Sequence, residues 1–354
     1  MIPYVFLIAA SMAGAPLLAR WPKYRRTYLL ALGAACWLLA SLRYITGFDY
    51  RSYETFFQMV SVEGLPGLAA RNGQEFAYYL LNLAVAYLGG DYRAFLFMFH
   101  FLLIGLVFVW IERYSPSPWM SVYLFLTLQY FAMSMNLLRQ AFAAAVILWT
   151  YSFLKSRRFF PYCGVVLLAA CFHQSALIMF PFYFLLNLRI SKLHYGLAAL
   201  LMGVVYCAVD PLMRFTMSIF PRYQSYLGSR YWQSNTIIYI LLPLGCFLFI
   251  LPLLRQTARN PSISPVWVNS VYYSLLIQLL ITRHFILERL SVYVAVFSLA
   301  ALPEAALTPE CKCSSRIRIS ILIAGGLAYF LFAASQNFHG VYPFHGIWAR
   351  AISA

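Results

Sequence analysis

The sequence predicts an all-α, polytopic membrane protein with about twelve transmembrane helices. Of its 354 residues, 63% are hydrophobic and only 10% are charged. The mean hydropathy is +0.73, and apolar runs long enough to cross a bilayer recur along the chain. Because no soluble core could bury this much apolar side chain, we expect a single transmembrane domain over residues 1–354.

Twelve apolar runs are the predicted membrane spans, and several of them are short. The first run has no basic residues before it and no clear break after Ala19, which favours a retained helix over a cleaved signal peptide. Two long loops, at residues 46–93 and 211–235, are expected on the outer side. The predicted spans cover residues 3–19, 27–45, 94–111, 119–135, 138–154, 159–172, 175–187, 194–210, 236–254, 266–283, 288–302 and 317–334.

The four lysines set the predicted orientation. Lys23, Lys155, Lys192 and Lys312 all fall in connectors, and the positive-inside rule assigns these connectors to the cytoplasm. If residues 76–89 crossed the membrane, every later connector would move to the opposite side of the membrane. These residues would cover only about 21 Å of a roughly 30 Å hydrocarbon core. Length alone leaves a short tilted span open, but the lysines favour an interfacial or re-entrant helix on the outer side.

In this orientation the outer side is rich in arginine. The cytoplasmic side carries fifteen lysines and arginines against three acids, whereas the outer side carries eleven arginines, no lysine and seven acids. A planar guanidinium binds two phosphate oxygens through two donors, while lysine offers a point charge. The pattern predicts an outer site for a polyanionic headgroup. The outer arginines are Arg43, Arg51, Arg71, Arg93, Arg139, Arg214, Arg222, Arg230, Arg283, Arg289 and Arg350.

Three of these arginines lie at the ends of apolar runs. Arg139 lies between two runs in MNLLRQAFAAA, and Arg283 and Arg289 bracket RHFILER. An unpaired guanidinium near hydrocarbon costs roughly 2.5 kcal/mol or more, so each side chain either reaches the interface or has an anionic partner. For Arg139 the alternative to ligand binding is a helix-end residue that extends to the interface. For the other two, the alternative is an ion pair with Glu288.

His173 marks a predicted turn within a long apolar stretch. The residues from Phe159 to Leu186 would form about 42 Å of straight helix, which is too long for one span. The chain is therefore expected to turn back at His173, so that the side chain points into the outer half of the bundle. A single histidine in apolar surroundings is often a satisfied core residue. Its location on the same side as Arg139 and Asp49 favours a ligand or a base.

Two carboxylates, Asp49 and Glu75, bracket the polar part of the first outer loop. Either could activate a hydroxyl, orient a sugar or only balance the arginine charge. The same loop carries Tyr50 and Tyr53, and residues 222–233 (RYQSYLGSRYWQ) bring more aromatic side chains to this side. Pyranose rings stack on aromatic faces while their hydroxyls take polar donors, so the loops predict a sugar-binding surface.

The sequence predicts no metal site, cofactor or disulfide framework. The seven cysteines lie mostly inside apolar runs, and Cys311 and Cys313 lack the spacing of zinc ligands. The outer side has no carboxylate pair at metal-ligand spacing.

Six sequence blocks occur in an order typical of one known family. The blocks are RYITGFDYRSY, QEFAYYLLN, MNLLRQAFAAAV, LAACFHQSALIMFP, ERLSVYVAVFSLAALP and NFHGVYPFH. From about Arg43 to Phe344 the chain resembles the EpsG family of membrane proteins, which belong with the Wzy-type polysaccharide polymerases. The arginine–glutamine and phenylalanine–histidine blocks are the most specific.

The resemblance implies an enzyme of the bacterial inner membrane with the GT-C glycosyltransferase architecture. Such an enzyme joins undecaprenyl-diphosphate-linked oligosaccharide repeats on the periplasmic face, for O-antigen or exopolysaccharide. Membrane lipids and a polysaccharide chain-length regulator are expected as further partners, and nucleic acid is not. The alternatives are an O-antigen ligase, a flippase for the same lipid and a membrane O-acyltransferase.

In this interpretation a hydroxyl of one repeat attacks the anomeric carbon of the growing chain and undecaprenyl diphosphate leaves. Arginines stabilise the departing diphosphate. His173 or Asp49 is the base, and Arg139 is the third catalytic candidate. The residues expected to bind substrate are Arg43, Tyr50, Tyr53, Glu75, Gln140, Arg283, Arg289, Tyr293, Asn337 and Tyr342.

Overall fold

The computed structural model describes residues 1–71, 75–189, 192–219, 224, 232, 237–259, 263–308 and 314–348. Within these ranges the regular structure is helical, apart from one isolated bridge between Arg43 and Gly346. The elements are α1 (Ile2–Arg20), η1 (Pro22–Tyr24), α2 (Arg25–Ser41), α3 (Tyr50–Ala70), α4 (Phe76–Tyr87), α5 (Tyr92–Tyr114), α6 (Pro118–Thr127), α7 (Tyr130–Asn136), α8 (Leu138–Leu148), α9 (Thr150–Lys155), α10 (Phe159–Ala170), η2 (Gln174–Ile178), α11 (Met179–Asn187), α12 (Lys192–Cys207), α13 (Val209–Ile219), η4 (Ile237–Ile240), α14 (Leu241–Arg259), α15 (Val266–Leu279), η5 (Leu280–Thr282), η6 (Phe285–Leu287), α16 (Glu288–Ala295), α17 (Ser298–Leu307) and α18 (Ser315–Ser335).

Apolar helices make this a membrane-embedded helical protein, but they do not support twelve continuous spans. In the described residues, three helices are long and apolar enough to cross a membrane alone: α1, α5 and α18. Two bent pairs, α12 with α13 and α16 with α17, raise the number to five if each pair is one span. The other apolar helices are shorter.

Several of the predicted spans are wrong as continuous helices because the backbone breaks inside them. The two bent pairs interrupt the predicted spans 194–210 and 288–302, and two further spans divide. The predicted span 119–135 divides into α6 and α7 at Gln129, whose φ of 67° is left-handed and cannot continue a right-handed helix. The predicted span 138–154 divides at Trp149 into α8 and α9.

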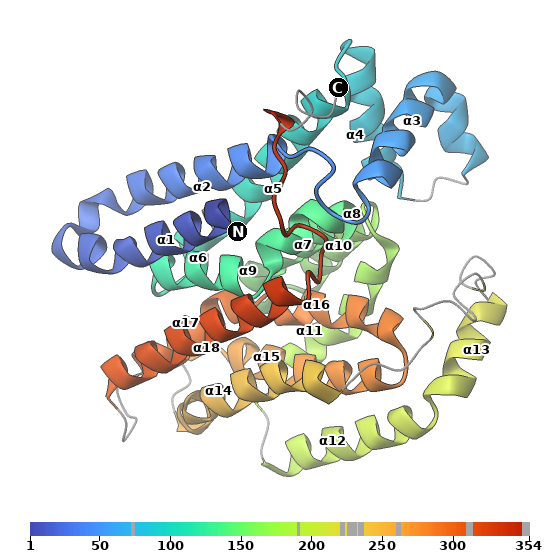
Figure 1. Ribbon diagram of the computed structural model, residues 1–354. Coiled ribbons are helices and arrows are strands. Elements are labelled where there is room, and N and C mark those ends of the chain that lie inside the picture. Colours follow the sequence, from blue (N-terminus) through green and yellow to red (C-terminus); the bar gives the residue numbers. More distant parts are fainter. Residues whose placement is uncertain are drawn as a thin grey trace.

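The N-terminal helices form one layer of the molecule (Figure 1). α2 packs along α5, and α1 packs against α6. The contact between α1 and α2 is close because Gly14 faces the ring of Tyr28, whose hydroxyl donates to the Ser11 carbonyl at 2.7 Å. Helices α14 to α18 lie on the other side of α6 to α9. The helices from the middle of the chain therefore lie between the N-terminal and the C-terminal helices.

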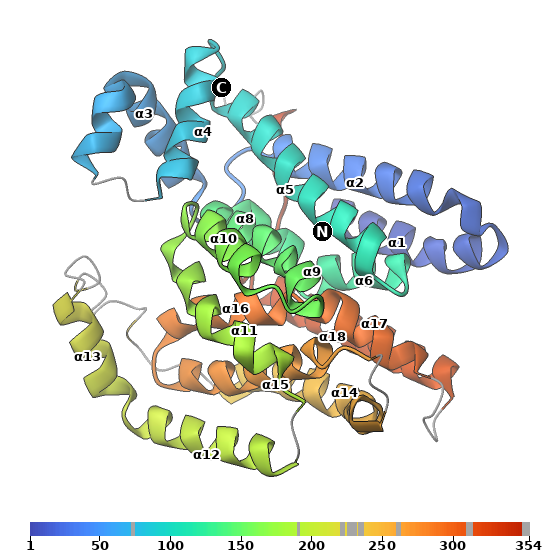
Figure 2. The same ribbon diagram turned by 180° about the vertical axis from the view of Figure 1, so that it is seen from behind.

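Helices α3 and α4 pack on each other and project from one end of the bundle. In both views α3, α4 and α13 lie at this end, whereas the α1–α2 connection and the start of α18 lie at the opposite end (Figure 2). The predicted orientation requires this separation, because Lys23 lies in the α1–α2 connection. α4 spans about 18 Å and runs roughly crosswise to α2. Its assignment as an interfacial helix stays a prediction.

The predicted outer loop at residues 46–93 is mostly helical, since α3 and α4 fill it. Gly64, with φ 59° and ψ −151°, kinks α3 just before Pro66. The second predicted outer loop, residues 211–235, begins within α13. Its aromatic segment, with Arg222 and Arg230, lies outside the described residues apart from Gln224 and Trp232.

The C-terminal segment returns to the start of the chain and connects the two layers. The backbone amides of Tyr44 and Gly47 donate to His345 and Gly340, at 2.7 and 2.8 Å. The Tyr4 hydroxyl donates to the Val341 carbonyl at 3.0 Å. These bonds attach the NFHGVYPFH block to the RYITGFDYRSY block, almost 300 residues away.

Candidate functional site

Three ionisable side chains from three distant blocks meet at the end of the bundle where α3 and α4 project. The two carboxylate oxygens of Glu75 contact different partners: Oε2 forms an ion pair with Arg139, and Oε1 lies 2.7 Å from His173 Nδ1. We call these three residues the Glu75 cluster. All three belong to the sequence-predicted site, although the sequence did not predict that Glu75 would join the other two.

The backbone explains why Glu75 and His173 meet. α10 ends at Ala170, and the chain turns at Cys171 and Phe172 before η2 begins, which confirms the predicted turn at His173. The amide of Ala77 donates to the Cys171 carbonyl at 3.2 Å and thereby attaches the start of α4 to this turn. Glu75 itself has a left-handed φ of 51°, a strained conformation that directs its side chain and is typical of functional sites.

Packing on α8 brings Arg139 to the same place. The ring of Phe142, one turn further along α8, stacks on Phe172 with 4.2 Å between centroids. The Arg139 guanidinium lies 5.8 Å from the centre of the Tyr53 ring and 5.9 Å from that of Tyr78. These rings, on α3 and α4, hold the guanidinium by cation–π attraction in addition to its ion pair.

The electrostatics of the cluster favour a neutral histidine and a charged carboxylate. Burial lowers the pKa of His173 below its usual value, although the hydrogen bond to Glu75 acts in the opposite direction. Burial also raises the pKa of Glu75, but His173 and Arg139 together outweigh burial and hold that pKa below its usual value. A neutral imidazole donates Nδ1–H to the carboxylate, which leaves Nε2 as a proton acceptor.

A cavity of about 1190 Å³ lies near the Glu75 cluster, although Glu75, Arg139 and His173 are not among the residues that line it. Gln140 and Arg289 both line it, and the Gln140 side-chain amide donates to the Arg289 carbonyl at 2.8 Å. Arg289 also acts electrostatically on His173 and Tyr53, so it connects the cluster with the cavity. A further contact joins η2 to α16 here, because the Tyr293 and Ser175 hydroxyls are 2.9 Å apart.

Two more predicted residues line the cavity, Asp49 and Asn337. The Asp49 backbone amide donates to the Asn136 side chain at 3.0 Å, which attaches the start of α3 to α7. Asn337 has a left-handed φ of 48°, as does Gln129 at 67° on the same cavity wall. The cavity lining therefore contains two strained backbone positions, and Glu75 is a third in the nearby cluster.

Other predicted residues lie apart from the Glu75 cluster. Arg43 is only 1% exposed, and its Nη1 donates to the Ala40 carbonyl at 2.7 Å and contacts His100 Nε2 at 2.9 Å. A guanidinium this deeply buried cannot contact a ligand from the cavity. Tyr50 is buried beside Arg43, and the Tyr342 hydroxyl donates to the Gln129 side chain at 3.1 Å.

Arg283 belongs to a second charged group. It forms an ion pair with Asp210 of α13, and the other oxygen of Asp210 lies 2.6 Å from His284 Nε2. Glu288 was the alternative partner for Arg283 or Arg289, and the acid that pairs with Arg283 is Asp210 instead. The structure does not bring Arg283 to the Glu75 cluster.

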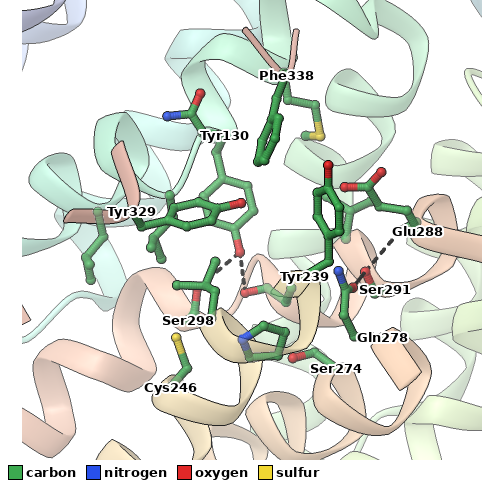
Figure 3. A pocket seen from close by; sticks show the side chains of 18 of the residues that line it. Tyr130, Tyr239, Cys246, Ser274, Gln278, Glu288, Ser291, Ser298, Tyr329 and Phe338 are labelled. Carbon is green, nitrogen blue, oxygen red and sulfur yellow. Dashed lines mark hydrogen bonds between the residues drawn. The ribbon is translucent and has the colours of Figure 1, made fainter. Parts of the chain in front are cut away.

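Glu288 is a cavity residue that was not predicted from the sequence. Its carboxyl is directed into the cavity together with Tyr239 and Tyr329 (Figure 3). Within the described part of the chain it has no hydrogen bond or ion pair, and its electrostatic neighbour is Arg289. The signal in the sequence was an acid at the start of a predicted span, which is a reason to expect function rather than charge balance.

Polar groups near Glu288 give the cavity wall a mixed character. The Ser291 hydroxyl donates to the Gln278 side chain at 2.7 Å, and the Tyr130 hydroxyl donates to the Ala295 carbonyl at 2.7 Å (Figure 3). Tyrosine rings beside amide and carboxyl groups offer both stacking faces and hydrogen-bonding partners, the combination that a sugar ring requires.

Comparison with known families agrees with the sequence blocks. The model of the EpsG family matches residues 26–345, which include the Glu75 cluster and every cavity-lining residue. No curated protein and no solved structure matches the chain.

Proposed function

Because the chain belongs to the EpsG family, we propose that it polymerises lipid-linked oligosaccharide repeat units by glycosyl transfer. The lipid carrier is undecaprenyl diphosphate, and the reaction occurs on the periplasmic face of the bacterial inner membrane. The product is an O-antigen or an exopolysaccharide. The proposal includes a GT-C type architecture, with α4 as its interfacial helix and with broken helices among its spans.

One observation carries this proposal: Glu75, Arg139 and His173 converge beside a cavity that Arg289 lines. Arg139 and Arg289 bring two guanidinium groups to this place, beside the carboxylates of Glu75, Asp49 and Glu288. A guanidinium donates to an anionic ligand, and the neutral imidazole of His173 can accept a proton at Nε2. Glycosyl transfer from a diphosphate needs both.

In the proposed reaction, a hydroxyl oxygen of the acceptor repeat forms a bond to the anomeric carbon of the donor chain. The bond between that carbon and the diphosphate oxygen breaks, and undecaprenyl diphosphate leaves with the electron pair. Arg139 and Arg289 stabilise the charge that develops on the diphosphate. The hydroxyl proton passes to His173 Nε2, while Glu75 orients the ring. Asp49, on the cavity wall, binds a hydroxyl of the acceptor sugar.

A cell-free polymerisation assay with the native lipid-linked repeat tests the proposal. Purified wild-type protein should convert single repeats into a ladder of polymers. Arg139→Ala and His173→Ala should accumulate single-repeat product at normal protein levels. Each substitution should lower the rate of polymerisation about 100-fold or more. Arg51→Ala is the matched control, since this arginine is exposed on α3 and pairs only locally with Glu54. Full-length polymer from both site variants would refute the assignment.

The same assay separates the alternative functions by their products. A ligase would transfer one chain to a lipid A core, an O-acyltransferase would form an ester, and a flippase would leave the lipid-linked repeat unchanged. A ladder is expected only from a polymerase.

A further inference from the structure

The part of the cavity that α14 and α18 line is bordered mostly by apolar side chains. We propose that this region, between α14 and α18, holds the isoprenoid chain of the lipid carrier and opens sideways to the membrane. The inference rests on the proposed function and deepens it, because it assigns the tail of the substrate to a site of its own.

The size of the cavity is the first argument. Its volume of about 1190 Å³ exceeds the roughly 300–1,000 Å³ of most small-molecule sites. A diphosphate and one sugar would leave part of this volume empty. A substrate that combines a charged head with a long apolar tail would use both regions.

The second argument is the distribution of polar and apolar side chains along the cavity. Arg289, Gln140, Asp49 and Asn337 supply polar groups to the lining, and Arg289 acts electrostatically on His173 of the Glu75 cluster. Helices α14 and α18 contribute aliphatic, aromatic and small side chains to the lining: Leu241, Leu242, Leu248, Phe249, Ile321, Leu322 and Ala328. The Arg289 guanidinium complements a diphosphate, and the apolar side chains complement an isoprenoid chain.

The third argument is that the apolar walls also reach the outer surface of the molecule. Leu241 and Leu248 on α14 are 61% and 56% exposed, and Ile321 on α18 is 53% exposed, although all three line the cavity. In a membrane protein, exposed aliphatic side chains on spanning helices face lipid. The rim is therefore a passage through which an apolar chain can enter from the bilayer without crossing water.

Glycines on both walls keep this passage open. Gly245 of α14 and Gly325 of α18 line the cavity, and a Cβ atom added at either position would meet no atom within 4 Å. The neighbouring Gly326 differs, because a Cβ atom there would lie 2.8 Å from the Tyr123 ring. Gly326 is required for packing, whereas the exposed Gly325 borders open space that a ligand can occupy.

A substitution at Gly325 tests the tail site without touching the charged end. Gly325 lies ten residues before Ser335 at the end of α18, which is about 15 Å of helix. Gly325→Leu should fill the passage below the headgroup region. Gly164→Leu is the matched control, because a Cβ atom at Gly164 of α10 also meets open space and this residue does not line the cavity.

The measurement is the binding of two diphosphates to the full-length protein in lipid nanodiscs. Undecaprenyl diphosphate carries eleven isoprene units and geranyl diphosphate carries two, so only the longer chain should reach Gly325. Gly325→Leu should weaken the binding of undecaprenyl diphosphate about tenfold or more, because the displaced chain loses its close packing in the passage. Binding of geranyl diphosphate should change less than about twofold, and Gly164→Leu should resemble wild type with both probes.

The outcomes separate the two proposals. If wild-type protein binds neither diphosphate, the proposed function fails. If wild-type protein binds both and Gly325→Leu binds undecaprenyl diphosphate as tightly as wild type, only the tail site is refuted. An equal loss for both probes would also refute it, because the substitution would then act on the headgroup. Competition by phospholipid alone, without dependence on the diphosphate, would assign the passage to bilayer lipid and overturn the inference.

Discussion

His173 and Glu75 are 98 residues apart in the chain, yet the imidazole Nδ1 lies 2.7 Å from the carboxylate Oε1. This contact determines which ring nitrogen carries the proton. It also gives Glu75 two partners at once, since its second oxygen pairs with Arg139. The carboxylate thus connects the group proposed to accept a proton with the group proposed to bind the diphosphate.

Replacing Glu75 with glutamine should slow polymerisation about 10- to 100-fold, because a neutral amide is a weaker acceptor for the ring and no longer forms the ion pair with Arg139. The pH dependence should also change. His173 must be neutral to act as a base, so activity falls as the pH drops through its pKa. Glu75 raises the pKa of His173, so its removal should shift the acid limb of kcat/KM to lower pH. Glu54→Gln is the control, because Glu54 pairs with Arg51 on α3. An acid limb that does not move would contradict the pairing.

Replacing Arg139 with lysine should preserve the charge but not the function. The guanidinium contacts Glu75 and lies over the rings of Tyr53 and Tyr78. A lysine ammonium group cannot reproduce the contacts of a planar guanidinium with the carboxylate and the two rings. We expect kcat to fall about tenfold or more while the amount of folded protein is unchanged. Arg51→Lys, measured in the same polymerisation assay, should behave as wild type. Equal kcat for Arg139→Lys and wild type would show that charge alone suffices.

Replacing Glu288 with glutamine should separate stability from activity. The carboxyl lines a largely apolar cavity without a hydrogen-bonding partner in the described residues, which is an unfavourable environment for a charge. The neutral amide should therefore leave the melting temperature equal or raise it. Polymerisation should slow, with the larger effect on KM if Glu288 binds acceptor hydroxyls. A lower melting temperature with normal kinetics would identify a structural residue instead.

Replacing Arg43 with methionine tests whether this arginine belongs to the substrate site. Because Arg43 is only 1% exposed and contacts Ala40 and His100, KM for the lipid-linked repeat should stay within about twofold. An apolar side chain of similar volume at this buried position should leave the melting temperature unchanged or raise it. Arg289→Met is the matched variant, and its KM should rise because Arg289 lines the cavity. A similar rise in both variants would show that Arg43 reaches the ligand.

Local properties of the chain were predictable from the sequence. Helical membrane character followed from composition, and the turn at His173 followed from the length of the apolar stretch around it. The division of residues 119–135 at Gln129 was not predictable, because a left-handed residue between two apolar segments leaves no mark in hydropathy. The helical content of the loop at 46–93 was also missed, since α3 carries charged and aromatic residues that resemble a polar loop.

The arginines show which features of the site could not be predicted from the sequence. Arg43, Arg139, Arg283 and Arg289 look alike in the sequence, because each follows or precedes an apolar run. Their environments differ in the structure: Arg43 is buried beside His100, Arg283 pairs with Asp210, and only Arg139 and Arg289 lie near His173. Which anion lies near which guanidinium depends on helix packing, and hydropathy and residue spacing carry no information about it.

The sequence by itself determined that this is a helical membrane protein of the EpsG family, because apolar composition and the order of short blocks are local properties of the chain. Only the tertiary structure decided that Glu75 pairs with both Arg139 and His173, and that Glu288 lies in a cavity between α14 and α18. The physical reason is that both arrangements depend on where broken helices turn and on which helices they pack against. Those contacts join residues separated by tens to hundreds of positions, and they form only when the whole bundle is assembled.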